Sequence, residues 1–303
     1  MKKGLEKRKI HRLNEEVTFV GFGALSIGRD WGMGKGFDKK RPNENEAGKL
    51  LHAVLDSGIN LIDTASAYHR SEERIGKSIS HRRNEYILAS KCGEHNDEPG
   101  TYYDFSYNAV KQSIDRSLEL LKTDMIDIMQ IHFGPNPEKV IVDGETVKAM
   151  KDAKAEGKIR FLGASIDGEL ARHCINSGDF DIMQMEYNLL NQHNEGNIQL
   201  CKEKGIGVLI RTGLGRGLLT PKVLNYLEED MPHKKQIQAL LDLVNNDANL
   251  LSSIALQFLY QNDGISSVLI GTKNFERFEQ NMILLDKEID SSLLTKATEI
   301  VKS

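Results

Sequence analysis

The stretch Gly58-Ile59-Asn60-Leu61-Ile62-Asp63 places a glycine just before a short apolar run that ends in an aspartate. A glycine at this position supplies the left-handed turn that ends a helix at little cost. The same arrangement recurs at Gly157, Gly178 and Gly205, each of which precedes another apolar run. The repeated pattern predicts helices that end in glycine and lead directly into strands.

Eight such runs have the length and the apolar, β-branched composition of strands. They are Thr18–Gly23, Asn60–Asp63, Tyr86–Lys91, Asp127–His132, Arg160–Ser165, Asp181–Glu186, Gly207–Arg211 and Ser267–Gly271. The runs are nearly continuous in apolar residues, which is typical of a parallel sheet covered by helices. Between them lie amphipathic stretches such as Ser106–Leu121, where Ser106 is a suitable N-cap.

Eight strand–helix units occur in 303 residues without a break in composition. This organisation predicts a single domain, residues 1–303, folded as a closed (β/α)8 barrel with a parallel eight-stranded sheet. An open, doubly wound sheet is the alternative. We expect the segment before Val17 to form a hairpin that caps the bottom of the barrel, and the tail from Asp290 to Val301 to pack outside it.

The overall composition narrows the class of protein. The chain has 40 basic and 44 acidic residues and a net charge of −4, which gives no electrostatic footprint for nucleic acid. No apolar run has the length of a membrane span, and the N-terminus lacks the apolar core of a secretion signal. The three cysteines, Cys92, Cys174 and Cys201, are widely spaced, which is typical of a reduced compartment. We therefore expect a cytoplasmic protein without nucleic-acid or membrane partners.

Four side chains with acid–base chemistry lie at or just after consecutive predicted strands. Asp63, Lys91 and His132 end the second, third and fourth strands, and Tyr68 follows the second. In a barrel all strand C-termini open on one face, where the four side chains meet. An open sheet also brings three neighbouring strand ends together.

Together these groups suit general acid–base catalysis at a carbonyl or an alcohol. A free phenol has a pKa of about 10, and a neighbouring ammonium lowers it. We expect Lys91 to tune Tyr68 in this way, Asp63 to hold Lys91, and His132 to orient the substrate oxygen. The sequence contains no H-E-x-x-H, no G-x-S-x-G and no carboxylate cluster for a metal. The reducing power is therefore expected from a bound cofactor, without a metal.

Three separated motifs, Asp-Thr-Ala-x-x-Tyr at 63–68, Ser90-Lys91 and Gln130-Ile131-His132, resemble those of the aldo-keto reductases in order and spacing. The resemblance runs from about Thr18 to Asn281. It implies a (β/α)8 barrel that binds NADP(H) without a Rossmann unit. It also implies that Tyr68 is the general acid, that Lys91 and Asp63 tune it, and that His132 orients the carbonyl.

The resemblance extends less evenly to the cofactor contacts. Ser165 and Gln184 match positions that hold the nicotinamide carboxamide, but Ile166 replaces the family's usual asparagine. Where an aromatic residue commonly stacks on the nicotinamide, this chain has Arg211. A guanidinium can stack through its planar face but adds positive charge, so we expect a different geometry or redox preference.

Two segments are expected to bind the cofactor's phosphates. The loop after the seventh strand, with Gly213, Leu214, Gly215 and Gly217, fits a pyrophosphate site of a barrel, although an ordinary flexible loop is the alternative. The segment after the eighth strand opens a helix, whose N-terminus favours a phosphate. There Lys273 and Arg277 are placed to bind a 2′-phosphate, which predicts NADP over NAD; a solvated basic helix start is the alternative. This segment resembles the family's adenosine-phosphate site at Gly271, Thr272, Lys273, Asn274, Arg277, Gln280 and Asn281, with Gln280 in place of a frequent glutamate.

Substrate selection is expected from long loops. The loop Ser26 to Asn45 carries Trp31 among Gly28, Gly32, Gly34 and Gly36 and suggests a mobile flap with one aromatic wall. The loop Cys92 to Phe105 carries Tyr102, Tyr103 and Phe105, which line a substrate pocket or simply pin the loop. We predict that Trp31, Tyr102 and His132 contact the substrate.

These patterns predict an NADPH-dependent reductase of small aldehydes or ketones. A dehydrogenase that oxidises a sugar alcohol or aldose is one alternative. A second is an NADP(H)-binding redox sensor with little turnover, like the potassium-channel accessory subunits of the same family. The oligomeric state stays open, with a monomer favoured.

Overall fold

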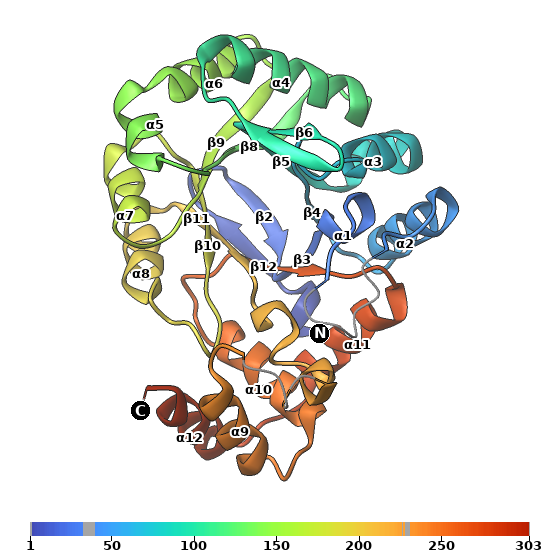
Figure 1. The fold of residues 1–303 in the computed structure, drawn as a ribbon, viewed down its shortest axis with the longest axis vertical. Helices are drawn as coiled ribbons and strands as arrows, with labels where there is room; N and C mark the ends of the chain where they lie inside the picture. Colours follow the sequence, from blue (N-terminus) through green and yellow to red (C-terminus); the bar gives the residue numbers. More distant parts are fainter. Residues whose placement is uncertain (1, 33–39, 226, 228–230, 303) are drawn as a thin grey trace.

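Eight parallel strands form a closed barrel in the computed structural model, which describes residues 2–32, 40–225, 227 and 231–302 (Figure 1). Around the barrel the order is β10, β11, β12, β3, β4, β5, β8 and β9. Their bounds are β3 Val20–Gly23, β4 Leu61–Asp63, β5 Ile87–Cys92, β8 Ile126–His132, β9 Ile159–Ser165, β10 Ile182–Glu186, β11 Gly207–Arg211 and β12 Ser267–Gly271. The (β/α)8 prediction is confirmed, and the closed order excludes the open sheet.

Helices surround this barrel (Figure 1). They are α1 Leu25–Gly28, α2 Glu44–Asp56, α3 Ser71–Ile79, α4 Tyr107–Leu121, α5 Pro137–Asp143, α6 Glu145–Ala155, α7 Gly168–Ser177, α8 Glu195–Lys204, α9 Lys234–Leu243, α10 Ala248–Tyr260, α11 Phe275–Asp286 and α12 Ser291–Lys302. Short 3-10 turns include η3 Gly215–Gly217 and η4 Pro221–Asn225. One predicted strand is shorter than expected, because Thr18 ends β2 and only Val20–Gly23 joins the barrel.

The helix-ending glycines behave as predicted. Gly58, Gly157, Gly178 and Gly205 have φ angles of 94°, 76°, 82° and 69°, a region that L residues rarely adopt. At the other end of a helix, the side chain of Ser106 accepts a hydrogen bond from the amide of Ala109 and caps α4. Local sequence signals therefore set where helices stop and strands begin.

The N-terminal segment forms the predicted hairpin, β1 Lys7–Ile10 and β2 Glu15–Thr18. Its apolar residues Ile10, Leu13 and Val17 are buried against side chains of the barrel interior, such as Leu61 and Ile128. The hairpin thus closes the bottom of the barrel by removing apolar surface from water.

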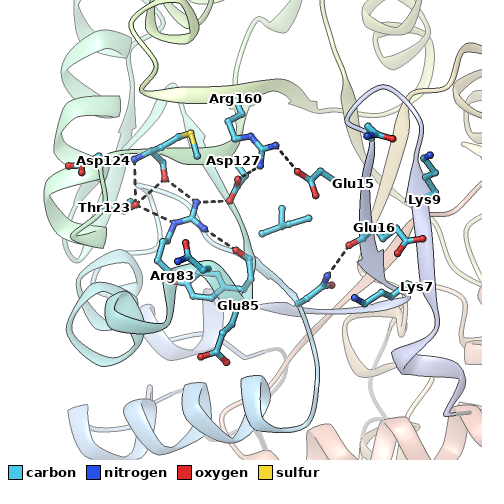
Figure 2. A pocket seen from close by; sticks show the side chains of 16 residues that line it. Lys7, Lys9, Glu15, Glu16, Arg83, Glu85, Thr123, Asp124, Asp127 and Arg160 are labelled. Carbon is cyan, nitrogen blue, oxygen red and sulfur yellow. Dashed lines mark hydrogen bonds and ion pairs between the residues drawn. The ribbon is translucent and has the colours of Figure 1, made fainter.

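Charged side chains join this hairpin to the barrel (Figure 2). Arg160 contacts Glu15 at 2.6 Å and Asp127 at 2.8 Å, and Arg83 contacts the other oxygen of Asp127 at 2.5 Å. They line an open cavity of about 730 Å³. The cavity lies at the N-terminal ends of the strands, whereas chemistry in barrels of this type occurs at the C-terminal ends.

The C-terminal segment packs as predicted. Helix α12 contacts α9 and α10 outside the barrel, and its Leu294 and Ala297 are buried in a second apolar cluster with residues of those helices. No helix in the described part of the chain combines the length and apolar character that a membrane crossing needs. That the whole chain is one domain stays a prediction.

One element was not predicted. The segment expected to be a loop after β5 contains a hairpin, β6 Glu94–Asp97 and β7 Gly100–Tyr103. Gly93 turns the chain from β5 into β6 with φ 95°, and a Cβ there would lie 2.3 Å from the ring of Phe105. This close packing at the mouth of the barrel requires a residue without a side chain.

Candidate active site

The four acid–base residues of the sequence lie together at the C-terminal end of the barrel. Asp63 and His132 are the last residues of β4 and β8, and Lys91 precedes the last residue of β5. Tyr68 follows β4 in the turn that leads to α3. Gly28 allows this turn to pack against α1, because a Cβ there would lie 2.1 Å from the carbonyl oxygen of Tyr68.

A buried ion pair is the centre of the site. Lys91 Nζ donates to Asp63 Oδ2 at 2.5 Å and to the carbonyl oxygen of Thr64 at 2.8 Å. The side chains of Asp63 and Lys91 are 4% and 0% exposed. Asp63 Oδ1 also accepts from Gln130 Nε2 and Gln184 Nε2, both at 2.9 Å. Both oxygens of the carboxylate therefore accept hydrogen bonds, which fixes the lysine in position.

The charge of Lys91 is maintained against its burial. Burial acts to lower the pKa of the Lys91 amine, but Asp63 and Tyr68 outweigh this effect, so that the pKa is raised overall. Lys91 Nζ lies 5.0 Å from the centre of the Tyr68 ring. At neutral pH the phenol thus has a charged ammonium as its neighbour.

The pKa of Tyr68 does not follow the sequence-based expectation. Burial raises the pKa of the phenol more than the charge and hydrogen bond of Lys91 lower it, and Asp63 raises it further. The expectation of a lowered pKa counted the ammonium alone and omitted desolvation. In this structure Tyr68 is a protonated phenol at neutral pH, which is the form that a proton donor needs.

His132 meets Tyr68 on one side and a carboxylate on the other. The two rings of Tyr68 and His132 are 5.9 Å apart and nearly perpendicular, at 85°. His132 Nδ1 lies 2.8 Å from Oε2 of Glu94, the first residue of the unpredicted hairpin. Burial acts to raise the pKa of the Glu94 carboxyl, but His132 and Thr101 outweigh it and lower the pKa overall.

Ser165 and Gln184 also lie at this end of the barrel. Ser165 ends β9 and donates to Gln184 Oε1 at 3.3 Å, while the Gln184 amide donates to Asp63. Both residues are buried, at 8% and 2% exposure. Ile166, where the aldo-keto reductases usually have asparagine, is 9% exposed and belongs to the apolar core. Their predicted contacts with a carboxamide stay predictions.

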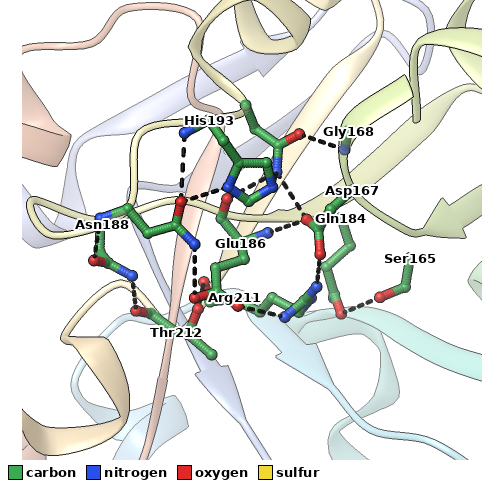
Figure 3. A network of polar contacts seen from close by, with 11 residues as sticks. Ser165, Asp167, Gly168, Gln184, Glu186, Asn188, His193, Arg211 and Thr212 are labelled. Carbon is green, nitrogen blue, oxygen red and sulfur yellow. Dashed lines mark hydrogen bonds and ion pairs between the residues drawn. The ribbon is translucent and has the colours of Figure 1, made fainter. Parts of the chain in front are cut away.

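Arg211 is held by two carboxylates (Figure 3). Its guanidinium forms ion pairs with Asp167, in the loop after β9, and with Glu186, which ends β10 and lies 3.3 Å away. Asp167 is fixed in turn by the amide of Glu186 and by Asn194, both at 2.8 Å. The positive charge that the sequence argument expected beside a nicotinamide is therefore balanced by two acidic neighbours.

The glycine-rich loop after β11 begins in close contact with β12 and α10. A Cβ on Gly213 would lie 2.8 Å from Val268 and 2.9 Å from Leu259, so close packing explains this glycine. Gly215 and Gly217 have φ angles of 58° and 102°, which favour glycine. Leu214 packs against the main apolar core and against the second apolar cluster, which includes residues of α9, α10 and α12.

The segment after β12 carries a basic cluster. Asn274 caps α11 by accepting from the amide of Arg277 at 3.1 Å. Lys273 donates to the carbonyl oxygen of Lys40 at 2.6 Å. Lys222 lies in η4, near Lys273 and Arg277. Burial lowers the pKa of the Lys222 amine, and the positive charges of Arg277 and Lys273 lower it further. Of the other predicted phosphate-binding residues, Thr272 is buried, Gly271 and Gln280 are exposed, and Asn281 donates to the carbonyl oxygen of Arg277.

The aromatic residues of the loops have different surroundings. Trp31 is 41% exposed, and residues 33–39 of its loop, with Gly34 and Gly36, lie outside the described residues. Tyr102 is 52% exposed and stacks on His95 at 5.0 Å. Tyr103 is paired with Glu94 across the hairpin and shares its face. Tyr103 therefore lies on the side of His132, whereas the substrate contact of Tyr102 stays a prediction.

The sequence argument missed several polar residues of the site. They are Glu94, which faces His132; Asp167 and Glu186, which hold Arg211; and Lys222 of the basic cluster. Gln130 was part of a quoted motif, but its hydrogen bond to Asp63 was not foreseen. Glu186 could have been found, because it ends the strand next to that of Arg211 and the two residues are paired in register. Glu94 gave no such signal, because its hairpin was read as a loop. The described residues contain no group of three or more His, Cys, Asp or Glu placed to hold a metal.

Comparison with known proteins agrees with this geometry. The profile of the aldo/keto reductase family matches residues 20–302. The chain therefore belongs to the aldo/keto reductase family, and it is an oxidoreductase of that family.

Two relatives cover nearly all of the chain. The uncharacterized oxidoreductase YqkF of Bacillus subtilis is 29% identical over 92% of this chain and 90% of its own length. The L-galactose dehydrogenase of Arabidopsis thaliana is 29% identical over 92% of this chain and 87% of its own. Among solved structures, the holo form of aldo-keto reductase AKR11C1 from Bacillus halodurans has a TM-score of 0.81 and 26% identity, covering 98% of this chain and 96% of its own.

Proposed function

We propose that this chain interconverts a small carbonyl compound and its alcohol with a nicotinamide dinucleotide, and that in the reductive direction Tyr68 is the proton donor. One observation carries the proposal. The ammonium of Lys91 is fully buried, fixed by Asp63 and the carbonyl oxygen of Thr64, and lies against the ring of Tyr68. Burying a charged pair costs free energy, and such pairs beside another ionisable group are typical of functional sites.

The residues present fit a dinucleotide. Lys222, Lys273 and Arg277 gather positive charge between the loop after β11 and the start of α11, as phosphate groups require. Ser165 and Gln184 supply a hydroxyl and a primary amide at the strand ends, which suit the amide of a nicotinamide. A bound nicotinamide dinucleotide supplies the hydride that these side chains lack.

Each residue has a defined task in the reduction. His132 orients the substrate oxygen beside Tyr68, and the phenol proton of Tyr68 passes to that oxygen as its negative charge develops. The raised pKa of Tyr68 keeps this proton in place until then. Lys91 stabilises the phenolate that remains, because opposite charges attract strongly in a site that excludes water.

The basic cluster favours NADP over NAD. Arg277 presents a planar guanidinium that binds phosphate oxygens in pairs, and it lies in the first turn of α11, while Lys273 directly precedes the N-cap Asn274. Cofactor choice varies among relatives: a 26% identical protein of Escherichia coli is named an NADH-specific methylglyoxal reductase. The preference for NADP therefore depends on the cations of this chain.

The oxidative direction is the second candidate. The 29% identical protein of Arabidopsis thaliana is named a dehydrogenase of L-galactose. The same Tyr68 and Lys91 pair performs this reaction in reverse, with the phenolate as the base.

Initial rates test the proposal. We expect a panel of aldehydes and ketones to cause oxidation of NADPH, followed by the absorbance of the reduced cofactor, at higher kcat/KM than with NADH. A panel of alcohols and aldoses with the oxidised cofactors measures the reverse reaction. Tight binding of NADPH without turnover on either panel would overturn the assignment as an enzyme.

A further inference from the structure

The hairpin β6–β7 carries one buried carboxylate to the catalytic histidine. Ser66 fixes the hairpin, because its hydroxyl donates to the carbonyl oxygen of Glu94 at 2.6 Å and lies 3.0 Å from that of Lys91. Glu94 is 7% exposed. Its Oε1 accepts from Thr101 at 2.7 Å, and its Oε2 lies 2.8 Å from His132 Nδ1. One oxygen is thus held by the hairpin itself, and the other is left for the imidazole.

The ring nitrogen has no competing partner. Nδ1 of His132 is buried and has no aligned hydrogen bond in the described part of the chain, and Glu94 is the acceptor within reach. Hydrogen bonds of catalytic groups are often poorly aligned before substrate binds. Other ionisable groups around the pair are Lys91 and Asp63 from the barrel strands, Tyr68 from the turn after β4, Tyr103 from β7 and Arg29 after α1. Of these, Asp63 is committed to Lys91, so Glu94 is the carboxylate that faces the imidazole.

The nitrogen that faces Glu94 decides what the other nitrogen can do. In a neutral imidazole one ring nitrogen carries the proton, and the hydrogen bond made by that nitrogen selects the tautomer. A carboxylate only accepts hydrogen bonds, so it selects the tautomer with the proton on Nδ1. Nε2 then has a lone pair and accepts hydrogen bonds, unless the ring takes a second proton.

We propose that Glu94 is a positioning residue that keeps Nδ1 of His132 protonated, so that Nε2 of the neutral ring accepts a hydrogen bond from an alcohol and only a doubly protonated ring donates one to a carbonyl. The inference deepens the proposed function and rests on it for its consequence. It makes the proton on Nε2 decide which of the two reacting oxygens the site binds better.

The tautomer is measured directly by nitrogen-15 NMR of the full-length protein, without substrate or turnover. The ring signals of His132 are identified by their loss in His132→Gln. We expect wild-type His132, at a pH where the ring is neutral, to show a protonated Nδ1 and a bare Nε2. A bare Nδ1 with the proton on Nε2 in the wild type overturns the inference, whatever the variants do.

Glu94→Leu removes the acceptor while keeping similar bulk. We expect the proton to move to Nε2 in this variant, and the tautomer to stay unchanged in the control Asp97→Asn, which removes an exposed negative charge from the same hairpin. Persistence of the Nδ1 proton in a folded Glu94→Leu protein also overturns the inference. If Glu94→Leu fails to fold, the wild-type spectrum still decides.

The NMR signature separates this role from a structural one, because a change in packing alone does not move the proton from one ring nitrogen to the other. Failure of the proposed function gives no turnover in the initial-rate assays and leaves the NMR result standing.

Discussion

The substitution Asp63→Asn isolates the buried ion pair at the centre of the site. It leaves Lys91, which is 0% exposed, without a counter-charge. It also places an amide NH2 where the carboxylate accepts hydrogen bonds from Lys91 and Gln130, so that donor faces donor. Breaking a buried pair by removing one partner costs about 3–5 kcal/mol, because a buried charge stays uncompensated. This is a large share of the about 5–15 kcal/mol that stabilises a typical domain.

Urea denaturation at neutral pH measures the change in the free energy of unfolding. We expect Asp63→Asn to lose about 3–5 kcal/mol. The matched control is Asp56→Asn, which breaks an ion pair with Arg82 in which the aspartate is 66% exposed, and it should cost about 1 kcal/mol or less. A loss in Asp63→Asn no greater than in the control would refute the reasoning.

The pH dependence of the loss has a defined sign. In the wild type the pKa of Lys91 is raised, so its contribution is complete below the unfolded value of about 10.4 and is lost only as pH rises through the folded value. Without Asp63, burial is the largest influence on the lysine and only Tyr68 opposes it, so the charged form is disfavoured. The stability deficit of the variant should therefore shrink as pH rises from neutral toward the unfolded value of about 10.4. A deficit that grows over this range contradicts the assignment of Lys91 as the affected group.

Three further predictions test other parts of the site. Tyr68→Phe should reduce kcat by about 100- to 10,000-fold while NADPH binding, measured by fluorescence titration, stays nearly unchanged; near-native turnover would remove Tyr68 as the donor. Lys273→Ala and Arg277→Ala should each weaken NADPH binding by about tenfold or more and NADH binding much less, and equal losses would argue against recognition of a 2′-phosphate. Glu72 is buried, and burial raises its pKa to about 7 in spite of a hydrogen bond from Ser90. Its ionisation therefore lowers the free energy of unfolding as pH rises from the pKa of the unfolded chain to 7 and above. Glu72→Gln should therefore gain stability relative to the wild type between about pH 5 and about pH 8, by denaturation, and a gain on the acidic side instead would show that Glu72 is not the titrating group.

The barrel could be predicted because its signals are local. A glycine such as Gly157 needs only its own backbone conformation to end a helix, and the apolar run after it needs only burial on both faces to form a parallel strand. The strand-end positions of Asp63, Lys91 and His132 followed from the same reading. Their convergence is a consequence of barrel closure.

Features that depend on contacts across the chain were missed. The hairpin that begins at Glu94 has a polar, exposed second half and no alternation of apolar residues, so its sequence looked like a loop. The pKa of Tyr68 was misjudged because a charge partner is visible in a sequence, whereas the amount of protein around a phenol is not. Arg211 was read alone, although Glu186 lies beside it in the strand register.

Hydride transfer itself is the most direct test of the account. NADPH that carries two deuterium atoms on the reduced nicotinamide carbon is incubated with the protein and an aldehyde that it turns over, and the alcohol is examined by mass spectrometry. The account predicts an alcohol with one deuterium on the carbon that was the carbonyl. An unlabelled alcohol, or no alcohol with any member of a broad aldehyde and ketone panel, would contradict it.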